Sequence, residues 1–251
     1  MDLGLDGRRA LVTGGSRGIG KAIARQLALE GAHVAIAARD GGRLAAAAAE
    51  LSAEAGRPVV GVAVDTGEAA AVTAMAGAVL EALGGVDILV NAAARPAGQA
   101  PAPRWDAVGE DDLFDEVRVK VLGYLRVAQA VVPSMQQAGW GRIINISGLA
   151  ARQASSVVGS IRNVAVAALT KNLADELAGT GINVVTVHPG MTVTEAMSDE
   201  RRALPSRNLV GRYIEASEVA DLVAFLASPR SVAVNGDVIA AGGGSPGAIF
   251  Y

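Results

Sequence analysis

The 251-residue sequence contains no cysteine, which excludes a disulfide framework and a thiolate metal centre. It has only two histidines, His33 and His188, which cannot form a zinc site without carboxylate ligands, so we expect no metal. Aromatic residues make up 3% and hydrophobic residues 51%, so the core must consist of Ala, Val, Leu and Ile. With 19% charged residues, this balance excludes a disordered chain.

Blocks of like charge and long apolar runs are also absent. Lys and Arg number 22 against 25 Asp and Glu, for a net charge of −3, and no basic cluster could neutralise a run of phosphates. We therefore expect no nucleic-acid partner. Residues 1–4 lack the basic region of a signal peptide, and the longest stretch without Asp, Glu, Lys or Arg, residues 177–194, contains three Gly, four Thr and a Pro. We expect no membrane span and a cytoplasmic protein.

What the sequence does have is a regular alternation of short apolar runs and helical stretches. The expected strands are residues 9–13, 33–37, 59–64, 86–90, 142–146, 182–187 and 237–240. The expected helices between them are residues 18–30, 41–55, 68–83, 110–138, 158–177 and 217–227. Continuous apolar strands separated by helices predict a mainly parallel, seven-stranded sheet. The expected fold is a single doubly wound, Rossmann-like α/β domain over residues 1–251.

Two longer segments interrupt this alternation. Residues 95–103 contain three prolines and are expected to form an exposed loop, and residues 195–213, rich in charge, are expected to form a mobile insertion. Loops at the ends of parallel strands commonly meet the substrate. We therefore expect a small-molecule substrate beside these segments.

A glycine-rich segment follows the first expected strand. It supplies Gly14, Ser16, Arg17, Gly18, Ile19 and Gly20. Backbone N–H groups in such a turn, together with the dipole of the following helix, can hold a pyrophosphate, and glycine permits the close approach. The position of this segment inside a strand–helix–strand unit predicts a nucleotide site.

The spacing G-x-x-x-G-x-G resembles that of the short-chain dehydrogenase/reductase family, and the resemblance covers almost the whole chain. It implies an NAD(P)-binding oxidoreductase fold. It also implies cofactor contacts from Asp65, which would accept a hydrogen bond from the adenine amino group, and from Asn91 after the fourth strand. Beyond the sixth strand, the matching segment supplies Pro189, Gly190, Thr192 and Thr194.

The end of the second strand decides which cofactor is expected. An acidic residue there would bind the adenosine ribose of NAD and repel a 2′-phosphate, but this chain has Ala38 followed by Arg39. Arg17 in the glycine segment supplies a second guanidinium, and two guanidinium groups favour a dianionic phosphate. We therefore expect NADP(H) rather than NAD(H). The alternative is that both arginines are solvated, with Asp40 neutralising Arg39.

The resemblance further implies a catalytic Tyr and Lys on the fifth main helix, and here the sequence departs from the family. Aligning residues 169–177 with the end of that helix puts the Tyr position at Gly159 and the Lys position at Asn163. Counting from the preceding strand instead gives Ile161 and Ala165. Neither register supplies a tyrosine or a lysine.

The other two expected catalytic positions are also changed. The serine position falls on Gly148, with Ser147 beside it, and the asparagine position on the fourth main helix falls on Lys120. A lysine, Lys120, thus stands at the family's asparagine position, and an asparagine, Asn163, stands at its lysine position. A cation could therefore still reach the nicotinamide ribose. The alternative is that Lys120 is a surface cation that pairs with Glu116 one turn earlier. Ser147, Lys120 and Asn163 are the catalytic candidates.

Other polar groups have open roles. Arg162 could bind a carboxylate or a phosphate, or form a structural salt bridge, and His188 could titrate near the cofactor or be a satisfied residue at a strand end. Tyr124 is expected in a subunit interface, because the fourth and fifth main helices often pair between subunits in this family. A homodimer or homotetramer is therefore expected. The interface face would comprise Val117, Val121, Tyr124, Ala128, Val166, Leu169, Leu173 and Leu177.

Two functions are consistent with this sequence. One is an NADP(H)-dependent oxidoreductase that transfers hydride to a carbonyl or an activated C=C bond and uses non-standard acid/base residues. The other is a non-catalytic NADP(H)-binding protein, acting as a sensor or a partner subunit, since an intact nucleotide motif stands beside altered acid/base positions.

Overall fold

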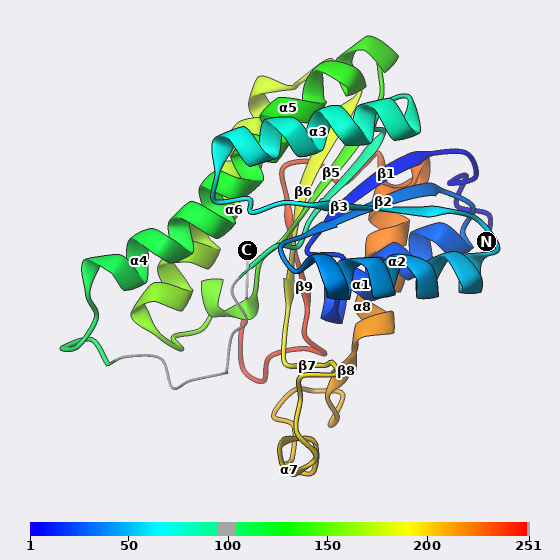
Figure 1. Cartoon of the computed structure of the whole chain (residues 1–251). Coiled ribbons are helices and arrows are strands. Elements are labelled where there is room, and N and C mark those ends of the chain that lie inside the picture. Colours follow the sequence, from blue (N-terminus) through cyan, green and yellow to red (C-terminus); the bar gives the residue numbers. More distant parts are fainter. Residues whose placement is uncertain (95–103, 250–251) are drawn as a thin grey trace.

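The strands form one large sheet and one small one. A computed structural model describes residues 1–94 and 104–249 (Figure 1). The large sheet comprises β1 (Arg9–Thr13), β2 (His33–Ala38), β3 (Val59–Ala63), β4 (Ile88–Asn91), β5 (Gly141–Ile146), β6 (Ile182–Pro189) and β9 (Val238–Ala241). Its order is β3-β2-β1-β4-β5-β6-β9 and every neighbouring pair is parallel. The predicted doubly wound, parallel seven-stranded fold is confirmed.

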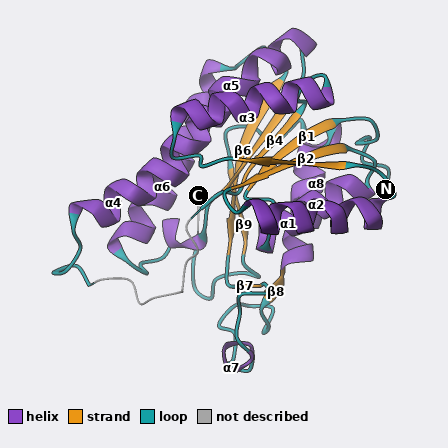
Figure 2. Ribbon diagram, in the orientation of Figure 1, coloured by secondary structure: helices purple, strands orange, loops and turns teal. Residues whose placement is uncertain are grey.

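Helices cover both faces of this sheet (Figure 2). They are α1 (Gly18–Leu29), α2 (Gly41–Ala55), α3 (Ala69–Leu83), α4 (Glu110–Glu116), α5 (Gly123–Ala138), α6 (Val157–Glu176), α7 (Asp199–Arg202) and α8 (Ala216–Ala227). α1, α2 and α8 pack on one face and α3, α5 and α6 on the other, each layer with its own apolar cluster. Because both faces are covered, a strand can be buried along its whole length, as β5 is.

The expected element boundaries agree with the observed ones to within about two residues, with one difference of kind. The helix expected over residues 110–138 is interrupted by a π-helical segment, η1 (Val117–Leu122), between α4 and α5. Wider π-helical turns often occur at functional sites, and this one contains Lys120. Short 3₁₀ segments, η2 (Leu149–Ala151) and η3 (Pro229–Ser231), follow β5 and α8.

The two expected loops differ in what the structure describes. The loop expected at 95–103 lies outside the described residues. The insertion expected at 195–213 contains α7 and leads into β8 (Ile214–Glu215), which pairs with β7 (Thr192–Val193) in the small sheet. Across residues 1–94 and 104–249, no helix has the length and apolar composition to cross a bilayer. Nor do His, Asp or Glu side chains there gather in threes that could hold a metal ion.

The face assigned to a subunit interface needs correction. Tyr124, Ala128, Val166 and Leu177 are buried within the chain itself, because this side of α5 and α6 faces the sheet. The apolar side chains that these helices expose are others, such as Ile161 and Val164. The other four assigned residues, Val117, Val121, Leu169 and Leu173, are half-buried, so self-association stays a prediction.

A chain of buried polar side chains links the middle of the sheet to α6. The Asn91 Nδ2 donates to Asn145 Oδ1 at 3.0 Å, and Asn145 Nδ2 donates to Thr170 Oγ1 at 2.9 Å. The Thr170 hydroxyl also lies 2.6 Å from that of Thr186. All four side chains are fully buried, so each depends on its neighbour for hydrogen bonding, and the chain fixes α6 against β4, β5 and β6.

We predict that Thr170→Val lowers the free energy of unfolding by about 1–3 kcal/mol, because the change leaves the Asn145 amide and the Thr186 hydroxyl without a partner. Urea unfolding measures this. The matched control is Thr73→Val on α3, where the lost hydroxyl is exposed and bonds only to the Ala69 carbonyl. Equal effects of the two variants would contradict the assigned role of the polar chain.

Candidate active site

A cavity of about 1210 Å³ opens at the carboxyl ends of the parallel strands. It lies where the strand order reverses, between β1 and β4, which is the place where open α/β sheets bind ligands. Its lining comes from the glycine segment after β1, the ends of β2 and β5, the π-helical segment, α6 and the segment after β6.

The glycine segment is compact enough to require glycine. Gly14 has a φ of +70°, and a Cβ there would stand 2.7 Å from the carbonyl carbon of Ala92. A Cβ on Gly20 would stand 2.3 Å from the Gly14 carbonyl oxygen. The Thr13 hydroxyl accepts hydrogen bonds from the Ala92 and Ala93 N–H groups, which holds the segment after β4 beside the glycine turn. The backbone at the start of α1 therefore faces the cavity, with no side chain on the glycines themselves to cover it.

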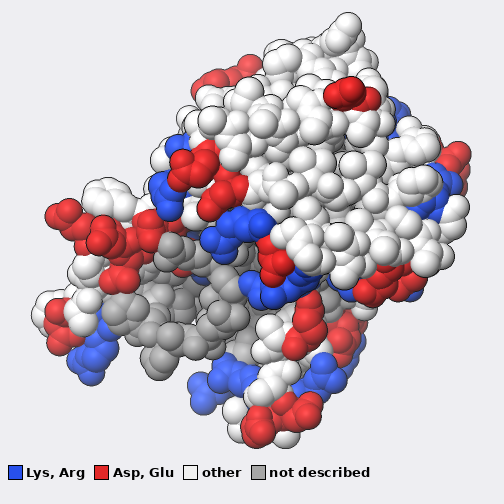
Figure 3. All heavy atoms as spheres, in the orientation of Figure 1, with Lys and Arg blue, Asp and Glu red and all other residues white. Residues whose placement is uncertain are grey.

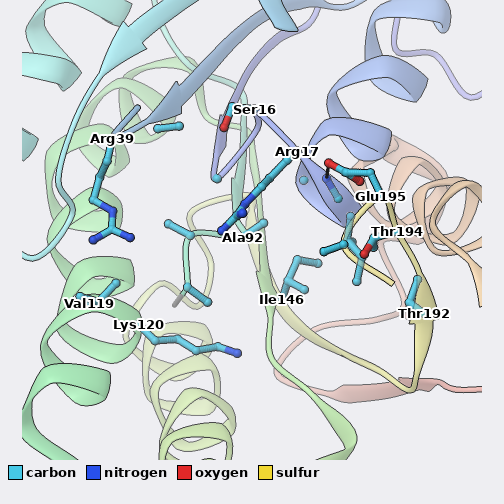
Figure 4. A pocket seen from close by; sticks show the side chains of 18 of the residues that line it. Ser16, Arg17, Arg39, Ala92, Val119, Lys120, Ile146, Thr192, Thr194 and Glu195 are labelled. Carbon is cyan, nitrogen blue, oxygen red and sulfur yellow. Dashed lines mark hydrogen bonds between the residues drawn. The ribbon is translucent and has the colours of Figure 1, made fainter. Parts of the chain in front are cut away.

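Positive charge gathers around the nucleotide half of the cavity. Within the described residues, six cationic and only two acidic side chains line the cavity as a whole, although the net charge of the chain is negative. In Figure 3, Lys and Arg gather at the centre of the face shown, while acidic side chains gather over the start of α4. Arg17 and Arg39 both project into the cavity (Figure 4).

A third guanidinium joins them. Arg43, in the first turn of α2, also lines the cavity, and the sequence reasoning missed it. Its spacing in the sequence could have indicated it, because Arg43 lies one helical turn after Arg39. Asp40 caps α2 by accepting from the Arg43 N–H at 3.0 Å and lies 3.4 Å from its guanidinium. These contacts hold the pKa of Asp40 below its usual value, with Arg17 adding to the effect. Asp40 therefore pairs with Arg43 and not, as considered, with Arg39.

Most of the expected cofactor residues line the cavity. They are Gly14, Ser16, Arg17, Gly18, Ile19, Gly20, Arg39, Gly190, Thr192 and Thr194. Three do not. The Asn91 side chain points into the buried polar chain, Asp65 accepts from the Gly67 N–H at 2.8 Å just outside the lining, and Pro189 ends β6 behind Gly190. The Asn91 side chain therefore has a structural role, and a contact of this residue with a cofactor stays a prediction.

The catalytic candidates come together around Lys120, which lies on the opposite side of the cavity from Ser16 (Figure 4). Lys120 is 3% exposed, and its Nζ donates to Asn163 Oδ1 at 2.9 Å and to the Ser147 carbonyl at 3.0 Å. The Ser147 hydroxyl donates to the carbonyl of Asn163 at 3.0 Å. Lys120 is therefore not the surface cation that the alternative described. The Lys120 ammonium therefore links three elements: the π-helical segment that carries it, the end of β5 and α6.

The surroundings of Lys120 lower its pKa to about 7. Burial is the main cause, because it penalises the charged amine, and the positive charge of Arg162 adds to it. Glu116 acts in the opposite direction. Arg162 and Glu116 form an ion pair with each other and both side chains are largely buried. The structural salt bridge considered for Arg162 is thus present, while a contact of Arg162 with a carboxylate or a phosphate of a ligand stays a prediction, since Arg162 also lines the cavity.

Two other expected groups do not face the reaction space. The Tyr124 hydroxyl donates to the Ile146 carbonyl at 2.9 Å, and burial raises its pKa well above its usual value. His188 is buried, and its Nδ1 accepts from the Gly148 N–H at 3.3 Å. Burial, together with Arg152 and Lys120, lowers the pKa of His188 to about 4, so the ring is neutral near pH 7. His188 is a satisfied residue at a strand end.

This cavity and fold agree with the relatives of the sequence. The profile of the short chain dehydrogenase family matches residues 8–205. The chain belongs to the short-chain dehydrogenase/reductase family, and its class is that of an NAD(P)-dependent oxidoreductase.

Individual relatives match nearly end to end. The 3-oxoacyl-acyl-carrier-protein reductase FabG of Vibrio harveyi is 34% identical over 257 residues, covering 96% of this chain and 98% of its own. A short chain dehydrogenase from Burkholderia cenocepacia in complex with NADP is 36% identical, with a TM-score of 0.85 and coverage of 96% and 98%. The L-sorbose reductase of Gluconobacter frateurii, complexed with NADPH and L-sorbose, is 29% identical, with a TM-score of 0.90 and coverage of 99% and 100%.

We predict that Glu116→Gln lowers the pKa of the Lys120 amine further, since it removes the negative charge that opposes the effects of burial and Arg162. NMR titration of the Lys120 ε-carbon, assigned by comparison with Lys120→Met, measures this without any assay of activity. Asp111→Asn, an exposed change of the same charge on α4, is the control and should leave the pKa unchanged. An unchanged or higher pKa in Glu116→Gln would refute the electrostatic description.

Proposed function

We propose that this protein is an NADP(H)-dependent oxidoreductase in which the buried ammonium of Lys120 supplies the proton. The observation that carries the proposal is the convergence of Lys120, Asn163 and Ser147 at the edge of a nucleotide-sized cavity with a cationic lining. The substrate class is a small molecule with a carbonyl or an activated C=C bond.

The residues at the other end of the cavity fit the cofactor. Arg17, Arg39 and Arg43 offer charge-assisted hydrogen bonds to a 2′-phosphate, and the glycine turn lets a pyrophosphate approach the backbone at the N-terminus of α1. Two solved relatives are complexes with NADP or NADPH, which supports the same choice. When bound, the nicotinamide supplies the hydride.

The chain itself supplies binding and the proton. A lysine ammonium has three N–H donors, and protein oxygens accept from Lys120 Nζ through two contacts, so one donor is left for a substrate oxygen. With a pKa near 7, Lys120 can give up its proton at neutral pH as negative charge develops on that oxygen. Asn163 keeps the amine aimed at the cavity, and Ser147 in turn orients Asn163.

We propose that this arrangement departs from the family's Ser-Tyr-Lys-Asn set and that the departure is functional. The usual lysine lowers the pKa of a tyrosine, but among the described residues no tyrosine lines the cavity. Gly159 lies in the first turn of α6, where a Cβ would stand 2.7 Å from the Ser156 hydroxyl oxygen, so a side chain there would require Ser156 to move. Lys120 then acts directly and not through a tyrosine.

A second function, cofactor binding without turnover, is favoured by that same lack of a tyrosine in the described lining. On this alternative, Lys120 would only bind the nicotinamide ribose. The protein would then bind NADPH without oxidising it in the presence of ketones, enones or enoyl thioesters.

We predict that NADPH binds at least about tenfold more tightly than NADH, because one charge-assisted phosphate contact contributes roughly 1.4 kcal/mol or more. Arg39→Ala should remove most of this preference while leaving NADH affinity unchanged. Arg25→Ala, which breaks an ion pair with Glu54 outside the cavity, is the control and should affect neither cofactor. Fluorescence titration with each cofactor measures these affinities. Equal affinities for NADPH and NADH in the unchanged protein would refute the assignment of the arginines to the 2′-phosphate.

Turnover tests the proposal directly. We predict that NADPH is oxidised with at least one member of a panel of ketones, enones and enoyl-CoA thioesters. Lys120→Met should reduce kcat by at least about a hundredfold, the usual contribution of a general acid. Ser147→Ala keeps the carbonyl that accepts from Lys120 and should cost much less. Binding of NADPH with no turnover across the panel would instead favour the non-catalytic function, and full activity of Lys120→Met would exclude Lys120 as the donor.

A further inference from the structure

The carboxylate of Glu195 lies on the helix end that the glycine motif assigns to a phosphate. Its Oε1 accepts a hydrogen bond from the Gly18 backbone N–H at 2.8 Å (Figure 4). The two residues are 177 positions apart, since Glu195 belongs to the segment between β7 and α7. The contact therefore ties the segment after β6 to the first turn of α1.

The N-terminus of α1 has no anion of its own. Arg17 occupies the N-cap position without a side-chain hydrogen bond to the helix, and the first turn contains no acidic residue. A helix start in this condition leaves N–H donors and positive dipole charge unmet, which favours an anion from elsewhere. The Glu195 carboxylate, from a remote part of the chain, supplies this anion.

Glu195 is also held weakly compared with the other acidic group at the cavity. Asp40 caps α2 and contacts the Arg43 guanidinium, so its charge is used in the fold. Glu195 forms no ion pair within residues 1–94 and 104–249 and relies on the Gly18 N–H. Among the described residues, its charge thus faces the phosphate site with no direct cationic partner, and a stronger anion can replace it.

We propose that Glu195 is an internal competitor of the cofactor pyrophosphate. It satisfies the start of α1 when no dinucleotide is bound, and it must leave that position when the pyrophosphate arrives, since two anions cannot share one helix end. By competing for the start of α1, Glu195 therefore lowers the affinity of the protein for the cofactor. The inference rests on the proposed NADP(H) site.

The experiment compares cofactor affinity in the unchanged protein and three variants by fluorescence titration with NADPH. Glu195→Ala should lower the Kd for NADPH by about tenfold, equivalent to about 1.4 kcal/mol, because the competing anion is gone. Glu200→Gln is the matched control: it changes charge by the same amount on α7 but has no contact with Gly18, and its Kd should stay within about twofold. Glu195→Gln, which removes the charge alone, should fall between them.

A second ligand separates competition from a general charge effect. Adenosine 2′-monophosphate carries the 2′-phosphate but no pyrophosphate, so its affinity should be the same in Glu195→Ala and in the unchanged protein. Equal or weaker binding of NADPH by Glu195→Ala overturns this inference while leaving the proposed function in place. Equal tightening of both ligands also overturns it. No binding of NADPH to any of these proteins would overturn the proposed function and this inference with it.

Discussion

The constraint on which the site depends is the burial of one ammonium group. A charge inside the protein is costly unless hydrogen-bonded oxygens meet it, and Lys120 has two such partners, the Asn163 side chain and the Ser147 carbonyl. These partners come from α6 and from the end of β5, while Lys120 comes from the π-helical segment, so the three elements must keep their relative positions. The same burial brings the pKa of the amine to about 7, which suits the proposed role of Lys120 as a proton donor near neutral pH.

The fold places the Lys120 amine and a group of three arginines at two sides of one cavity. Parallel strands end at a common edge, so the segments after β1, β2 and β5 meet there although they are far apart in the sequence. Arg17, Arg39 and Arg43 make the nucleotide end positive in a chain whose net charge is −3. The buried chain from Asn91 to Thr186 holds α6 in place, and α6 carries Asn163. Sheet stability and site geometry are therefore coupled.

The sequence predicted what depends on local pattern. The alternation of apolar runs and helices gave the sheet and its parallel order, and the glycine spacing gave the turn before α1. It could not predict contacts that depend on rotation about a helix axis. From the sequence, Lys120 could point to solvent or to the cavity, and in the structure it is buried in the π-helical segment. Tyr124 was assigned to an interface, although that side of α5 faces the sheet. The contact of Glu195 with Gly18 joins segments that no local pattern relates.

The central claim is that the Lys120 ammonium donates the proton, and the pH dependence of a single turnover tests it most directly. With saturating NADPH and a reducible substrate, the rate of reduction should be constant below pH 7 and fall as the pH rises through about 7, because the donor is the protonated form. In Lys120→Met the residual rate should lose this dependence. A rate that does not change between pH 6 and pH 9, or the same falling limb in Lys120→Met, would contradict the account.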